Sequence, residues 1–214
     1  MAEYQLCCFA QSGHSYKAAL MLNLIAADWA PIFVDFFNGA TRSQAYRSDV
    51  NEMGEAPVLL HQGKKLSQSG LILTYLAERS GRFGGDNDDE RDEVLRWILF
   101  DNHRFTSYVA TSVFQRAIRN AGDPAVHAFL QGRIKSAFGI VEKRLASLPF
   151  ITGGKPSIAD ISMCGYLYYP PEHLGFDIVA DYPAIAAWLE RIKALPNWEH
   201  PHKLMPGHPS AAAA

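Results

Sequence analysis

Ser69 and its neighbour Gln68 mark the clearest binding chemistry in the chain. Ser69 is expected to be the N-cap of an apolar helix that ends at Gly81, its C′ residue. A helix start gathers unpaired N–H groups and the positive end of the helix dipole, so it attracts an anion. Gln68 beside it both donates and accepts hydrogen bonds. Ser69 is therefore a candidate site for an anion.

Two adjacent cysteines, Cys7 and Cys8, invite a redox interpretation that their spacing does not support. A redox pair needs a spacing such as C-x-x-C at a helix start, whereas neighbours on a strand point to opposite faces. We expect one core cysteine and one shielded cysteine. His200, His202 and His208 are separated by proline and glycine, so a mobile tail is expected there and no metal site.

The elements that must position these residues alternate in type over the first 81 residues. A strand is expected at 4–9, and a helix follows it, with apolar positions between Ala18 and Ala26. Strand character returns at 32–37, and 38–55 is expected to be a loop with one irregular helical turn. The turn Gln62-Gly63 predicts a hairpin of strands at 57–61 and 64–67. The order is β-α-β-loop-β-β-α.

The rest of the chain has the period of helices. A glycine-rich, acidic stretch at 82–89 is expected to be a linker. Four helices are expected after it, the third opened by a capping box that pairs Ser157 with Asp160. The predicted fold class is therefore α+β followed by an all-α bundle, with domains at 1–81 and 90–209 and a tail at 210–214.

Composition limits the functions that fit this layout. The 214 residues are 48% hydrophobic and 20% charged, and the formal net charge is -2, so nothing indicates a nucleic acid or an anionic membrane as partner. No uncharged run of 18 residues is present, and the pattern of the first residues does not predict a signal peptide. Three cysteines do not form a secreted disulfide framework, so a cytoplasmic location is expected.

The motifs resemble those of the cytosolic glutathione transferases over nearly the whole chain. The strongest match is the run Asn51–Leu59, followed by Gly63 and by Gln68–Leu76, which looks like the glutathione-binding segment of that family. Ser157–Asp160 after Phe150–Gly154 is similar to the family's buried capping box, and Asp181–Pro183 with Trp188-Leu189 is a third similarity. The resemblance implies a thioredoxin-like first domain and a bacterial-type member of the serine class, closest to theta-, zeta- or delta-like members.

The resemblance also implies how glutathione is held as co-substrate. Pro57 is expected to be cis, and the backbone of Ala56 would pair with the cysteinyl part of glutathione as an added strand. Gln68 and Ser69 would hold the γ-glutamyl head group, with the carboxylate at the helix start. Glu55 is the remaining residue expected at this glutathione site.

The group that activates the thiol is expected in the loop before the first helix. No tyrosine stands at the end of the first strand, and the position used by cysteine-type members is occupied by Gly13 or His14. The resemblance implies that members using serine carry it near Ser12, so Ser12 is the candidate that donates to the glutathione sulfur, with the helix start adding positive potential. His14 is a second catalytic candidate, and Ser15 is a weaker alternative because it falls inside the first helical turn.

In the helical half, the resemblance places a pocket for a small hydrophobic electrophile. Phe105, Tyr108 and Tyr166 are the expected lining residues. Asn102, His103 or Arg104 are expected to reach glutathione or the seam of a homodimer. The predicted function is glutathione transfer to a small electrophile, including dehalogenation or peroxide reduction, in a detoxification role.

Two alternatives stay open at this stage. One is a glutathione-fold binding protein without turnover. The other is a zeta-like isomerase, although that group carries a Ser-Ser-Cys run where Ser12-Gly13-His14 stands. A serine-dependent thiolate would distinguish an enzyme from a binding protein.

Overall fold

The chain divides into two units in the computed structural model, which describes residues 2–118 and 123–207. The first unit joins the chain up to Arg82 with the residues from Pro196 onward, and the second spans Phe83–Leu195. Residues 196–207, which we expected in the helical domain, therefore belong to the first unit. The expected tail at 210–214 lies outside the described residues.

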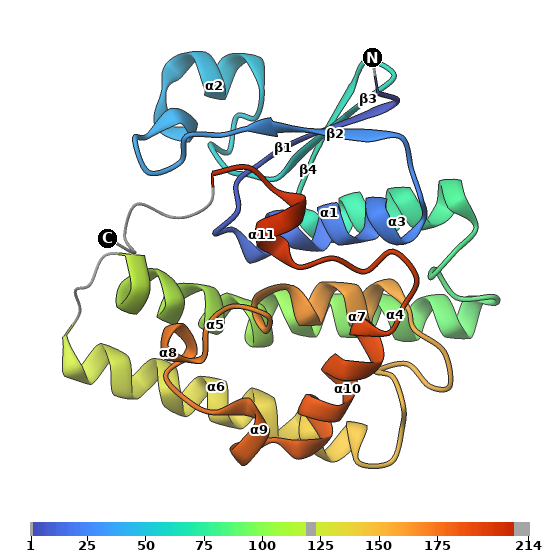
Figure 1. Cartoon of the computed structure of the whole chain (residues 1–214), viewed down its shortest axis with the longest axis vertical. Helices are drawn as coiled ribbons and strands as arrows, with labels where there is room; N and C mark the ends of the chain where they lie inside the picture. Colours follow the sequence, from blue (N-terminus) through green and yellow to red (C-terminus); the bar gives the residue numbers. More distant parts are fainter. Residues whose placement is uncertain (1, 119–122, 208–214) are drawn as a thin grey trace. The chain divides into compact units, whose positions relative to one another are not determined.

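The first unit is built on a mixed sheet with the strand order β2-β1-β3-β4 (Figure 1). The neighbours β1 and β2 are parallel, while β3 is antiparallel to both β1 and β4. This order confirms the β-α-β and β-β-α halves predicted from the sequence. The strands are β1 (Tyr4–Cys8), β2 (Trp29–Phe33), β3 (Val58–His61) and β4 (Lys64–Ser67).

The second strand lies earlier in the chain than predicted. We expected strand structure at 32–37, but β2 pairs in register with β1 from Tyr4–Trp29 to Cys8–Phe33. Its length is therefore set by β1 and not by the apolar run that follows. Pro31 has no N–H for a ladder, and β2 tolerates it because it is an edge strand.

Helices α1 (Gly13–Leu24) and α3 (Ser69–Ser80) lie side by side on one face of the sheet (Figure 1). The region expected as a loop with one helical turn holds the 3-10 turn η1 (Ala40–Arg42) and helix α2 (Gln44–Asp49). Residues 58–67 form the predicted hairpin around Gln62-Gly63, both with positive φ.

The prediction of a mobile tail around His200 and His202 is wrong for residues 196–207. This segment contains helix α11 (Pro201–Leu204), which packs beside α1. The Ala10 N–H donates to the carbonyl of Pro206 at 2.8 Å, which ties the segment to the end of β1. Prolines and glycines break long helices, but they did not prevent this segment from packing.

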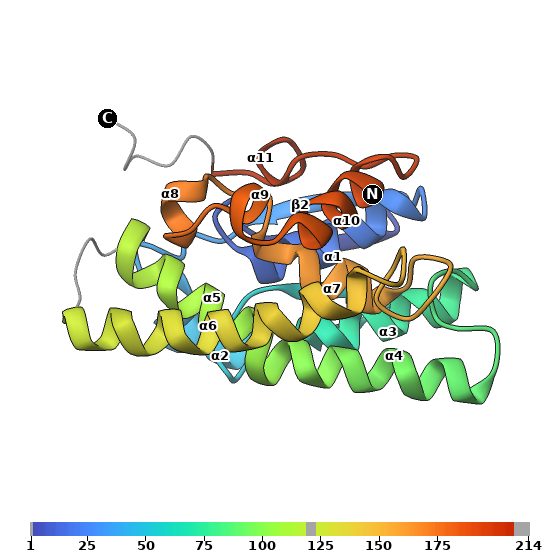
Figure 2. The ribbon, with the colours of Figure 1, turned by 90° about the horizontal axis from the view of Figure 1, so that it is seen from below.

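The second unit consists of helices. The segment from α4 through α5 runs one way, and α6 returns antiparallel to it (Figure 2). Two short helices, α8 and α9, fill a stretch for which we predicted none. The helical elements are α4 (Asp88–Phe100), the π-turn η2 (Asp101–Phe105), α5 (Thr106–Val113), the π-turn η3 (Phe114–Ile118), α6 (Pro124–Leu145), α7 (Ile158–Met163), the 3-10 turn η4 (Cys164–Tyr166), α8 (Pro171–Leu174), α9 (Ile178–Asp181) and α10 (Pro183–Lys193).

Helix α7 is the centre of this unit, because each of its residues is buried. The predicted capping box is confirmed: Ser157 caps the helix, and the Asp160 carboxylate accepts from the Ser157 N–H at 2.9 Å. Across residues 2–118 and 123–207, no helix combines the length and the apolar character that a membrane crossing requires.

Candidate functional site

The segment before β3 has the backbone geometry predicted for the peptide site. The Ala56–Pro57 bond is cis, as expected from the motif. Gly54 has φ +69°, and a Cβ there would lie 2.9 Å from the carbonyl oxygen of Thr41, so only glycine fits. Side-chain donors hold the carbonyl of Glu55 on the other side of the loop: Tyr46 Oη and Asn51 Nδ2, each at 3.0 Å.

Ser69 occupies the first turn of α3, but the N-cap assignment was wrong by one residue. The N-cap is Gln68, which has φ +68° and makes no side-chain cap bond, and Ser69 is the first helical residue. The first turn carries no acidic side chain, so its N–H groups and the helix dipole still favour an anion. The Gln68 Nε2 donates to Glu55 Oε2 at 2.9 Å, which brings together two of the residues predicted for the glutathione site.

Ser12 is the N-cap of α1. Its Oγ accepts from the Ser15 N–H at 3.1 Å, so its own hydroxyl proton remains available to donate. The Ser12 side chain is largely buried, His14 is half-buried in the first turn, and that turn carries no acidic residue. Ser15 is buried, and its Oγ has no hydrogen-bond partner among the described residues. The geometry therefore fits thiolate stabilisation by Ser12.

The cysteines near this loop are not poised for redox chemistry. Cys7 and Cys8 are both buried and free, and burial raises the pKa of Cys8 to about 12. Burial also raises the pKa of Cys7. Both thiols therefore stay protonated at neutral pH, and neither is a thiolate nucleophile.

The residues predicted to line the electrophile pocket lie in the second unit, but they are not alike. Phe105 is 1% exposed and stacks on Phe138 at 4.5 Å between ring centroids, so it packs in the core of this unit. Tyr108 is half-exposed beneath the Arg133 guanidinium, and Tyr166 is buried beside Tyr169. Apolar residues at helical spacing identify the apolar face of a helix. The spacing does not show whether that face packs in the core or lines a pocket.

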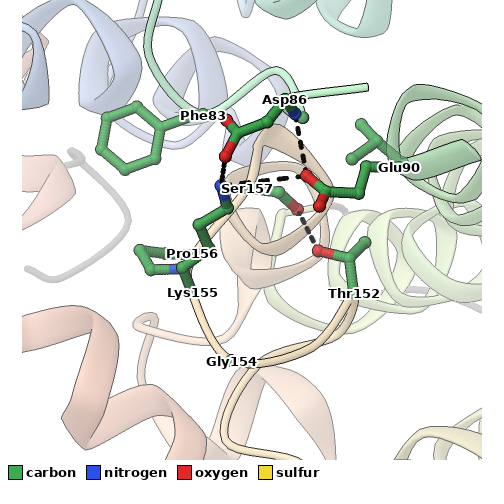
Figure 3. A pocket seen from close by; sticks show the side chains of 10 residues that line it. Phe83, Asp86, Glu90, Thr152, Gly154, Lys155, Pro156 and Ser157 are labelled. Atoms are coloured by element: carbon green, nitrogen blue, oxygen red, sulfur yellow. Dashed lines mark hydrogen bonds and ion pairs between the residues drawn. The ribbon is translucent and has the colours of Figure 1, made fainter. Parts of the chain in front are cut away.

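A cavity of about 140 Å³ in the second unit lies elsewhere, between the expected linker and the capping box (Figure 3). Lys155 pairs with Asp86 and with Glu90 at its rim, and Thr152 donates to Ser157 Oγ at 3.1 Å inside it. None of the residues predicted for the electrophile pocket lines this cavity. The Ile158 N–H also donates to the carbonyl of Phe83. Hydrogen bonds and ion pairs therefore connect the linker region to the start of α7.

Comparison with known proteins agrees with this geometry. Residues 5–78 match the N-terminal domain of glutathione S-transferases, and residues 117–191 match their C-terminal domain. A glutathione S-transferase structure from Pseudomonas fluorescens Pf-5 has 31% sequence identity and a TM-score of 0.85, with 92% of this chain and 98% of that chain covered. The chain therefore belongs to the glutathione S-transferase family.

Relatives of this chain include both a transferase and a disulfide-bond oxidoreductase. Glutathione S-transferase F14 of Arabidopsis thaliana is 27% identical over 192 residues, which is 85% of this chain and 76% of that protein. The disulfide-bond oxidoreductase YfcG of Escherichia coli is 28% identical over 204 residues, or 88% of this chain and 89% of that protein. Ure2p in complex with glutathione has a TM-score of 0.83 at 19% identity over 92% of this chain and 96% of that chain, which shows the fold alone.

Sequence reasoning missed two residues of this region. Asn51 was part of the matched segment but was given no role, and Tyr46 fell in a stretch expected to be mainly loop. Neither could be identified by residue type, because a single tyrosine or asparagine in a polar stretch is ordinary. Their shared partner, the Glu55 carbonyl, is visible only in three dimensions.

Proposed function

We infer that this chain is a glutathione transferase that uses Ser12 to hold the glutathione sulfur as a thiolate. The cis Ala56–Pro57 peptide, together with the α3 start at Gln68 and Ser69, supports a glutathione site in the first unit. Ser12 supplies a hydroxyl donor at the start of α1. The thiolate attacks an electrophilic carbon, a C–S bond forms, and the leaving group departs with its electron pair.

His14 has a secondary role in this proposal. It lies in the first turn of α1, where a neutral or charged imidazole assists a thiolate or a carboxylate of glutathione. Phe105, Tyr108 and Tyr166 are proposed as wall residues for a small hydrophobic electrophile. We place the reaction in the cytoplasm, where the three free cysteines stay reduced.

The glutathione site is tested by calorimetry on the double variant Gln68→Ala, Ser69→Ala. Loss of the head-group contacts should weaken glutathione binding by about 2 to 3 kcal/mol, because hydrogen bonds to charged groups are lost. Ser107→Ala, which removes a hydroxyl from α5, is the matched control and should bind normally. Equal affinity in the double variant and the wild type would refute the site.

Similarity to the E. coli oxidoreductase favours glutathione-dependent disulfide exchange as a second candidate activity. Here the glutathione thiolate attacks one sulfur of a disulfide and the other sulfur leaves as a thiolate. The buried Cys7 and Cys8 take no part, so replacing each by Ala should leave the rate unchanged. An assay panel of aryl halides, epoxides, hydroperoxides and a small dialkyl disulfide ranks the two activities.

A homodimer completes the proposal. Leu95 and Leu99 lie one turn apart on α4 and are 51% and 61% exposed, which indicates an apolar surface that a second copy would cover. Sedimentation should give about twice the 23.7 kDa of one chain. A single-chain mass at micromolar concentration would contradict the dimer.

A further inference from the structure

The Glu55 carbonyl receives two side-chain hydrogen bonds. Tyr46 Oη and Asn51 Nδ2 each donate to this oxygen at 3.0 Å, so both of its lone pairs are used. The Asn51 Oδ1 accepts from the Met53 N–H at 3.1 Å, which fixes the amide in the orientation that donates to Glu55. Asn51 is 3% exposed, so burial and these two hydrogen bonds together define its position in the loop.

Tyr46 is held in place by packing as well as by this bond. Its ring packs against a buried cluster of Cys7, Phe9, Val34 and Val58, which lie in the strands or directly after them. Burial raises the pKa of the Tyr46 phenol to about 12, so the hydroxyl remains a donor across the neutral range. Because its ring is held by packing, the Tyr46 hydroxyl keeps the Glu55 carbonyl pointing in one direction.

The direction of that carbonyl decides where the next N–H points. A peptide unit is planar, and in a trans peptide the C=O of Glu55 and the N–H of Ala56 point in opposite directions. Donors on the carbonyl also polarise the amide, which strengthens its N–H as a donor. Among the described residues no group accepts the Ala56 N–H, so it is free to bind a ligand.

We propose that Tyr46 and Asn51 are positioning residues that orient the Glu55–Ala56 peptide for hydrogen bonding to the cysteinyl part of glutathione. This inference rests on the glutathione site proposed above and deepens it. Both residues act through the peptide and not by touching the sulfur. Their loss should therefore change affinity at one part of the ligand and leave the chemical step nearly intact.

The test compares glutathione with γ-glutamylethylamide, which has the head group but no cysteinyl carbonyl. Tyr46→Phe removes one donor and keeps the ring, so it should weaken glutathione binding about three- to tenfold. The affinity for γ-glutamylethylamide should change less than about twofold, and so should kcat at saturating glutathione. A change of that size is expected of a substitution that does not affect the measured contact. Tyr168→Phe is the matched control, because it removes a tyrosine bond to the carbonyl of Leu189 in the other unit.

Asn51→Asp provides a second variant, since it keeps the acceptor for Met53 and removes the donor to Glu55. If Tyr46→Phe fails to fold, the same ligand comparison on Asn51→Asp decides the question. Unchanged glutathione affinity, or an equal loss for both ligands, would overturn the positioning role. A wild-type chain that binds γ-glutamylethylamide but not glutathione would overturn it too, whereas failure to bind either ligand would also refute the proposed glutathione site.

Discussion

At the scale of single residues, thiol activation depends on the hydroxyl proton of Ser12. Its Oγ accepts from the Ser15 N–H, so the hydroxyl proton is still available to donate to the sulfur. Ser12→Ala should raise the pKa of bound glutathione by about 1 to 2 units, because the charged form loses its hydrogen bond. Conjugation should slow while glutathione affinity stays nearly constant. Ultraviolet absorbance of the thiolate, titrated with pH, measures the change.

Two further variants make this test specific. Ser12→Thr retains a hydroxyl and should restore most of the thiolate, whereas His14→Ala should have a smaller effect than Ser12→Ala. If His14 is instead the dominant group, the rate will follow an imidazole ionisation at about pH 6 to 7. Equal thiolate absorbance in the wild type and Ser12→Ala would refute the serine assignment.

The surroundings of Glu93 lower the pKa of its carboxyl group. Arg96 donates to both of its oxygens, at 2.6 and 2.8 Å, and the indole N–H of Trp97 and the Arg144 guanidinium each donate at 2.8 Å. The hydrogen bonds from Arg96 are the main reason that the pKa of Glu93 is lowered to about 2. A lowered folded-state pKa stabilises the protein above the unfolded value of 4.5.

Glu93→Gln should therefore lower the free energy of unfolding at neutral pH by about 1 to 2 kcal/mol, after allowance for solvent screening. The difference from wild type should shrink as pH falls from 4.5 toward 2, where the native carboxylate is protonated. Denaturant unfolding at several pH values measures it. Glu190→Gln breaks an exposed pair with Lys193 and should change stability by less than about 0.5 kcal/mol.

The residues that sequence reasoning identified share a local signal. Pro57, Gln68 and Ser69 were predicted because a short motif and a helix start determine their geometry, and the cis bond is confirmed. The packing of Phe105 on Phe138, 33 positions further along the chain, has no such local signal and is visible only in the fold. Whether these residues contact glutathione stays a prediction.

At the scale of elements, the capping box shows what a short helix needs in order to be buried. The Asp160 carboxylate accepts from the Ile151 N–H and the Trp188 indole at 2.8 Å, as well as from Ser157. It thereby joins the start of α7 to the loop before it and to α10. Elements distant in the chain meet at one side chain.

Asp160→Ala should lower the free energy of unfolding by about 3 to 5 kcal/mol, because several buried donors lose their acceptor. Thermal and denaturant unfolding both report it. Asp177→Ala removes an exposed helix cap in the same unit and should lower stability by only about 1 kcal/mol. Similar losses in the two variants would show that burial adds nothing to the Asp160 network.

Elements with strong local signals were predicted, and the others were not. The Gln62-Gly63 turn and the α3 end at Gly81 follow from positive φ angles that glycine favours. The position of β2 depends on its register with β1, and the π-turns η2 and η3 depend on packing inside the helical unit. The spacing of hydrophobic residues in the sequence specifies neither the register of two strands nor the packing between helices.

At the scale of the whole molecule, the first unit is built from two segments that are far apart in the sequence. Residues 196–207 come after the helical unit but belong to the first unit. The Tyr16 hydroxyl donates to the carbonyl of Glu199 at 2.9 Å, and the Gln11 side chain donates to the carbonyl of Gly207 at 2.9 Å. Gln11 immediately precedes Ser12, so the last described segment supports the loop that carries the thiol activator.

Truncation after Leu195 should therefore destabilise the first unit and impair thiolate formation, although it removes no residue of the proposed glutathione site. Truncation after Gly207 is the control and should behave as the full chain. Because the shorter chain can fail to fold, Met205→Ala is a milder variant: the Met205 side chain is 3% exposed, and its removal should lower stability by about 2 to 4 kcal/mol. Thiolate absorbance measured on folded Met205→Ala separates support of the loop from general stability. An unchanged thiolate titration in that variant would show that the segment stabilises the unit without positioning Ser12.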